Sequence, residues 1–129
     1  MEPKTDVASV SEWLKLREIS VPDVRSEREE GSVVTVLKVG FLAVSPTDCA
    51  ASRVSAPVLA SGKCILPTAV IDSNGEPLLH RLPIGLANWV IDCVALARTG
   101  ERLFPTQVEF GALHGNHYAD FQLKRPASH

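Results

Sequence analysis

The apolar and polar positions of residues 32–45, SVVTVLKVGFLAVS, do not alternate as they would in a half-exposed strand. The run is rich in Val, Leu and Phe, which favour a strand, and Lys38 is its only charged residue. If the run is extended, neither of its two faces is polar. We therefore expect a long strand that is covered on both faces and bent near Gly40. Its second face is covered either by the rest of the chain or by a neighbouring subunit.

Helical spacing predicts two helices. The more regular one spans residues 85–99 and has Gly100 in position to end it. Its apolar side consists of Leu86, Trp89, Val90, Cys93, Leu96 and Ala97. Ser9 and Glu12 have the spacing of a capping box, which predicts a short helix over residues 9–18.

Paired strands account for most of the remaining chain. Asn74-Gly75 is a hairpin signal, and Gly115-Asn116 suits a second hairpin turn. We expect strands over residues 63–72, 76–82, 103–113 and 117–124, with a long connection over 46–62 that holds a short edge strand at 54–59. The sequence therefore predicts an α+β fold: an antiparallel sheet of five to six strands with the 85–99 helix packed on it. We expect one domain over 1–129, with flexible tails at 1–7 and 125–129.

Composition narrows the class of protein. The chain has 129 residues, 45% hydrophobic residues and a net charge of −2, which is typical of a globular domain without a general affinity for polyanions. The first ten residues do not have the pattern of a secretory signal peptide, and the three cysteines are an odd number. We therefore expect an intracellular, cytoplasmic protein. A bilayer requires about 20 apolar residues, so residues 32–45 predict no membrane span.

Few residues point to chemistry. His114 and His117 lie three apart and are the candidate metal ligands, but the same segment suits a hairpin turn, which is the interpretation we favour. No phosphate loop, nucleophile elbow or dinucleotide-binding motif occurs in the sequence. We expect no catalytic residue, no cofactor and no metal, although an enzyme whose site the sequence does not reveal stays open as an alternative.

The distribution of charge favours a binding or assembly protein. Residues 32–75 carry only five charged side chains, so we expect part of their surface to be covered in an assembly, either by a second copy in a homo-oligomer or by another protein. An adaptor, a chaperone-like protein or a small viral structural or accessory protein would have this character. The predicted interface residues are Val34, Val36, Phe41, Leu42 and Val44. The alternative is nucleic-acid binding through a basic patch of Arg98, Arg102, Lys124 and Arg125.

Overall fold

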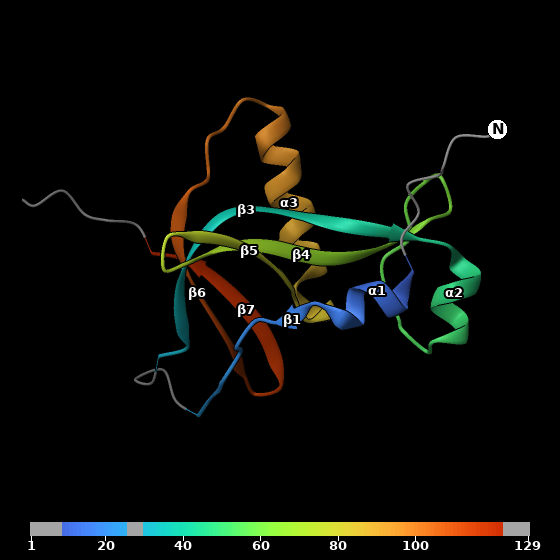
Figure 1. The fold of residues 1–129 in the computed structure, drawn as a ribbon, viewed down its shortest axis with the longest axis horizontal. Helices are drawn as coiled ribbons and strands as arrows, with labels where there is room; N and C mark the ends of the chain where they lie inside the picture. Colours follow the sequence, from blue (N-terminus) through green and yellow to red (C-terminus); the bar gives the residue numbers. More distant parts are fainter. Residues whose placement is uncertain (1–8, 26–29, 123–129) are drawn as a thin grey trace, which may run out of the picture.

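The longest strand, β3 (Ser32–Val44), lies at the centre of a mixed sheet in the computed structural model, which describes residues 9–25 and 30–122 (Figure 1). Within these residues the sheet has seven strands in the order β1-β5-β4-β3-β6-β2, and β7 pairs with β6. The other strands are β1 (Arg17–Glu18), β2 (Asp23–Val24), β4 (Cys64–Ser73), β5 (Glu76–Arg81), β6 (Thr106–Leu113) and β7 (Asn116–Phe121). The α+β class is confirmed. The sheet is not wholly antiparallel, because β1 pairs with β5 and β2 pairs with β6 in the parallel direction.

β3 changes partner part-way along its length. Its residues 32–36 pair with β6, its residues 36–44 pair with β4, and the ladder is irregular between Val36 and Lys38. The bend predicted at Gly40 is therefore misplaced, because Gly40 lies in regular register with Thr68. The irregularity has the form of an extra residue inserted into β3, and it falls where the two ladders meet.

The main helix, α3 (Ala87–Arg98), follows a turn of 3₁₀ helix, η1 (Ile84–Leu86), and packs on one face of the sheet. Trp89 meets Phe110 edge to face, with 5.6 Å between the ring centroids. Gly100 follows the helix with a φ of 94°, as predicted. Leu96 and Ala97 are exposed, although both continue the apolar side of the helix. That side therefore runs beyond the part of the helix that the sheet covers.

Two short helices, α1 (Val10–Lys15) and α2 (Pro46–Ala51), cover the opposite face of the sheet near Val44. The capping box of α1 is present, but the helix ends at Lys15 and not at residue 18. The reason is tertiary: the Ile19 N–H donates to the Arg81 carbonyl oxygen, so the chain before it joins the edge of β5 as β1.

α2 occupies part of the segment that we expected to be a connection. Ser45 caps it by accepting a hydrogen bond from the Asp48 N–H, and Pro46 begins it. With six residues and one buried side chain, Cys49, the helix has no apolar period to detect. The expected edge strand at 54–59 is reduced to a single bridge between Val58 and Cys64.

The hairpin turns follow from backbone conformation. Asn74 and Gly75 have φ angles of 53° and 89°, as the hairpin signal predicts. The second turn uses His114 and Gly115, with φ angles of 53° and 82°, and so begins one residue earlier than expected. The tails predicted at 1–7 and 125–129 lie outside the described residues. Among the helices that are described, none has the length and apolar character to cross a membrane.

Candidate functional site

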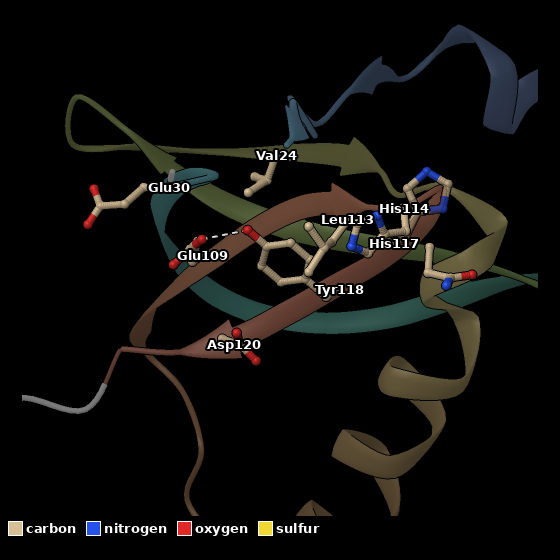
Figure 2. Close-up of a pocket in the computed structure, with 9 residues that line it drawn as sticks. Val24, Glu30, Glu109, Leu113, His114, His117, Tyr118 and Asp120 are labelled. Atoms are coloured by element: carbon tan, nitrogen blue, oxygen red, sulfur yellow. Dashed lines mark hydrogen bonds between the residues drawn. The ribbon is translucent and has the colours of Figure 1, made fainter. Parts of the chain in front are cut away.

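A pocket of about 680 Å³ lies at the β6–β7 hairpin (Figure 2). Its lining combines carboxylates, imidazoles, an amide, a phenol and two aliphatic side chains: Val24, Glu30, Glu109, Leu113, His114, Asn116, His117, Tyr118 and Asp120. Lysine and arginine are not among these residues. The pocket therefore has an acidic lining.

Tyr118 and Glu109 are joined by a hydrogen bond in this pocket, and Figure 2 shows the phenol hydroxyl directed at the carboxylate. Tyr118 donates a hydrogen bond of 2.6 Å to Oε2 of Glu109, and the Gly31 N–H donates to the same oxygen at 2.8 Å. The hydrogen bond to Glu109 raises the pKa of Tyr118 to about 12. A phenol that stays protonated at neutral pH is a donor here and not a base. This network fastens the start of β3 to the last hairpin.

The two candidate metal ligands both line the pocket, but neither is set up as a metal site. His114 is a turn residue, and the His117 ring lies against Gly85, where an added Cβ would be 2.5 Å from Nδ1. In the described chain, no three His, Cys, Asp or Glu side chains are grouped so that they could hold a metal ion. The turn interpretation explains His114, and no third ligand supports the alternative.

The three cysteines are buried. Burial raises the pKa of Cys93 to about 11, and burial together with the neighbouring Cys64 thiol raises that of Cys49 to about 11. Both shifts disfavour the thiolate that a nucleophile requires. Neither cysteine is therefore activated.

The predicted interface residues lie on two faces of β3. Val34, Val36 and Phe41 belong to the core on the α3 side. Leu42 and Val44 belong to the core on the side of α1 and α2. Val36 and Val44 are fully buried by the chain itself, whereas the other three are partly buried. The interface itself stays a prediction for these residues.

One backbone edge of β3 is unpaired in the second half of the strand, as far as the described residues show. Residues 38–44 pair with β4 on one edge, and no strand of the described residues pairs with the other edge. Figure 1 shows this stretch running along the border of the sheet, with α3 behind it. A strand that is central at its beginning thus becomes an edge strand at its end.

The register identifies which backbone groups are open. The Leu82 N–H donates to the Pro67 carbonyl oxygen, so the backbone hydrogen-bonding groups of Pro67 point towards β5. Those of Ala69, two residues further along β4, point the same way. Hydrogen-bonding direction alternates along a strand, so the intervening Thr68 faces its β3 partner, Gly40. On β3, the residues on either side of Gly40 must then face away from β4. The N–H and C=O groups directed at the open edge belong to Val39, Phe41 and Ala43.

The other outer edges of the described sheet are better protected. β5 carries Pro77 and is extended by β1 beside His80 and Arg81. The hairpin strand β7 lies against η1, where Gly85 touches His117. The open part of β3 has no proline, and no strand of residues 9–25 or 30–122 covers it.

Two hollows border residues 38–41 of β3, and the first of them lies on the side of the open edge. The first, of about 340 Å³, is a groove between β3 and the second half of α3, and its lining is mainly apolar: Lys38, Val39, Cys93, Val94, Ala97, Arg98 and Phe104. The second, of about 220 Å³, lies at Gly40, where an added Cβ would meet no atom within 4 Å. Lys38 is exposed and borders both. We call the first hollow the α3 groove and the second the Gly40 hollow.

The predicted basic patch is only partly described. Arg98 and Arg102 are exposed near the end of α3, whereas Lys124 and Arg125 lie outside the described residues. Of the two described arginines, Arg98 lines the α3 groove together with Lys38. These two residues are 60 positions apart in the chain, and nothing in the sequence indicated that they would line the same groove.

No protein-family model, curated protein or solved structure matches this chain. Function must therefore be argued from its own geometry.

Proposed function

We propose that this protein is a binding protein that takes up a β-strand from another polypeptide along the open edge of β3. The observation that carries the proposal is the row of backbone groups at Val39, Phe41 and Ala43, which has no partner in the described sheet. An unpaired strand edge is a template for a further strand, and native proteins usually block such edges. Main-chain hydrogen bonds would supply the affinity of the complex.

The surroundings of the edge support this proposal over chemistry at the β6–β7 pocket. The pocket's phenol and one of its carboxylates are engaged with each other. The β3 edge, by contrast, adjoins a groove that can receive side chains of an added strand. The sparse charge of residues 32–75 agrees with a surface that is covered in the working complex.

A proline at Ala43 tests the proposal, because it removes one outward N–H and leaves the β4 ladder intact. Ala43→Ser is the matched control, since it keeps the N–H. Self-association is measured by light scattering at micromolar concentration. Binding of other segments is measured by selecting a displayed library of random peptides of about ten residues, the upper end of common strand lengths.

We expect at least one of these two measurements to show binding that Ala43→Ser retains and Ala43→Pro loses. Circular dichroism and the unfolding midpoint establish that both variants are folded. A chain that stays monomeric and enriches no peptide would overturn the proposal. So would binding that is unchanged in a folded Ala43→Pro variant.

A further inference from the structure

We propose that the strand taken up by β3 is an extended segment of a different protein that carries an apolar side chain and a nearby carboxylate. This inference rests on the proposed function and names the partner's chemistry. It follows from the two hollows, from the charges around them, and from the residues that β3 itself could offer to a second copy.

The hollows match the alternation of an added strand. Successive side chains of a strand point to opposite faces of the sheet, so a strand beside Val39 would place one side chain on the α3 side and the next on the other side. The α3 groove lies on the first side, and its lining is aliphatic and aromatic apart from Lys38, Arg98 and Cys93. On the other face, Gly40 has no side chain, so a side chain of the added strand could reach across β3 towards the Gly40 hollow, which extends over β4 and β5.

Exposed apolar residues at the end of α3 support the same location. Leu96 is 45% exposed, although it continues the apolar side of a helix whose earlier residues Val90 and Cys93 are buried. In Figure 1 the last turns of α3 extend past the border formed by β3. A further strand would lie under this part of the helix and cover its apolar side.

Charge selects the partner. Lys38 and Arg98 are both exposed and border the α3 groove, and no carboxylate of the described chain lines either hollow. An incoming acidic strand would therefore meet Arg98 on the α3 side and Lys38 at the edge of β3, with no competing acid in either lining. A segment with a basic residue at this position would be repelled.

The β3 strand of a second copy of this chain does not supply the carboxylate that would complement Lys38 and Arg98. Residues 32–45 contain no Asp or Glu, so pairing two β3 edges would bring two copies of Lys38 and no carboxylate to the seam. The complementary strand is better provided by a different protein. A second copy is the competing occupant that the experiment must detect.

The experiment compares the same displayed peptide library on three forms of the full chain. These are the wild type, the charge-reversed Lys38→Glu/Arg98→Glu variant, and Lys63→Glu, which reverses an exposed lysine outside both hollows. Enriched peptides are synthesised, and their affinities are measured by fluorescence anisotropy at low and high salt. Light scattering is run on each form.

We expect wild-type peptides to share an Asp or Glu within a few positions of a large apolar residue. Their affinity should fall about tenfold or more in the charge-reversed variant and stay unchanged in Lys63→Glu. The charge-reversed variant should instead select Lys or Arg. Peptides that bind along β3 without an acidic preference would overturn this inference and leave the proposed function standing.

Three further outcomes are decisive. A dimer that Ala43→Pro abolishes would make the second copy the occupant, which overturns the inference while supporting strand uptake. No enriched peptide together with a strict monomer would overturn both. An equal loss of affinity in Lys63→Glu would show a general charge effect and would also reject the inference.

Discussion

Tyr118 donates a 2.6 Å hydrogen bond to Oε2 of Glu109 while its ring lies across Gly111, the residue directly opposite it in the β6–β7 ladder. An added Cβ at Gly111 would be 2.5 Å from the phenol oxygen, so the glycine is what admits the ring. The Gly31 N–H donates to the same carboxylate oxygen. The residue before β3 and the β6–β7 hairpin, which are distant in the sequence, therefore meet at one carboxylate.

Removing the phenol hydroxyl tests the strength of this junction. Tyr118→Phe should lower the free energy of unfolding by about 1–2 kcal/mol, because a hydrogen bond to a charged, partly buried acceptor is lost. The measurement is urea unfolding at neutral pH. Gly111→Ala should also be destabilising, since the ring would have to leave its place. An unchanged midpoint in Tyr118→Phe would show that the hydrogen bond contributes nothing to stability.

Alanine substitutions at Gly31, just before β3, and at Gly40, within β3, should have opposite effects on the free energy of unfolding. A Cβ on Gly31 would lie 2.2 Å from the backbone oxygen of Phe110, which cannot move without breaking the sheet. Gly31→Ala should therefore cost about 2 kcal/mol or more. Gly40→Ala is the control, because its Cβ would meet nothing within 4 Å, and it should be neutral or stabilising by up to about 1 kcal/mol. Equal effects of the two substitutions would contradict the packing described around Gly31.

Amide hydrogen exchange should alternate along the second half of β3. In the protein without a partner, the amides of Val39, Phe41 and Ala43 should exchange quickly, because they face the open edge. Those of Gly40 and Leu42 should be protected by β4. Exchange followed by NMR at low protein concentration measures this. Uniform protection at all five positions would mean that the edge is already covered.

Stability should decline in alkaline solution. The pKa of the buried Cys93 thiol is about 11 in the folded chain against an ordinary value of 9.0, so folding favours the protonated thiol. Its stabilising effect is complete below pH 9 and is lost as the pH rises from 9 towards 11. Cys49 should act in the same way over the same range.

The unfolding midpoint, measured at intervals across this pH range, checks the sign of the effect. Cys93→Ala should be less stable than the wild type at neutral pH but should lose less stability on alkalisation. Tyr118→Phe is a useful comparison, because the effect of Tyr118 begins at a higher pH and falls between its ordinary pKa of 10.0 and about 12. Identical slopes in wild type and Cys93→Ala would contradict the assigned cause.

Local signals in the sequence determined several elements of this fold. The capping box at Ser9, the Asn74-Gly75 turn and the helix-ending Gly100 depend on neighbouring residues only, so short-range spacing predicts them. The apolar period of 85–99 likewise predicted the main helix. The α+β class follows from the succession of these elements.

Tertiary structure decided what lies beside each element. Residues 17–18 are not part of the predicted helix, because their backbone pairs with the edge of β5 instead. The helix α2 begins at a capping residue, Ser45, and has no apolar period that would predict it. The bulge between Val36 and Lys38 arises where β3 changes partner, a long-range event that the local glycine at position 40 did not indicate. Lys38 and Arg98 both line the α3 groove for the same reason.

The sequence alone thus determined that residues 32–44 form a long, charge-poor strand, because that property belongs to the strand's own side chains. Only the tertiary structure decided that its second half has a backbone edge that no other described strand pairs with. Strand pairing joins residues far apart in the chain. The backbone N–H and C=O groups that pair are the same for almost every residue type, so the side chains do not show which strand edge is paired.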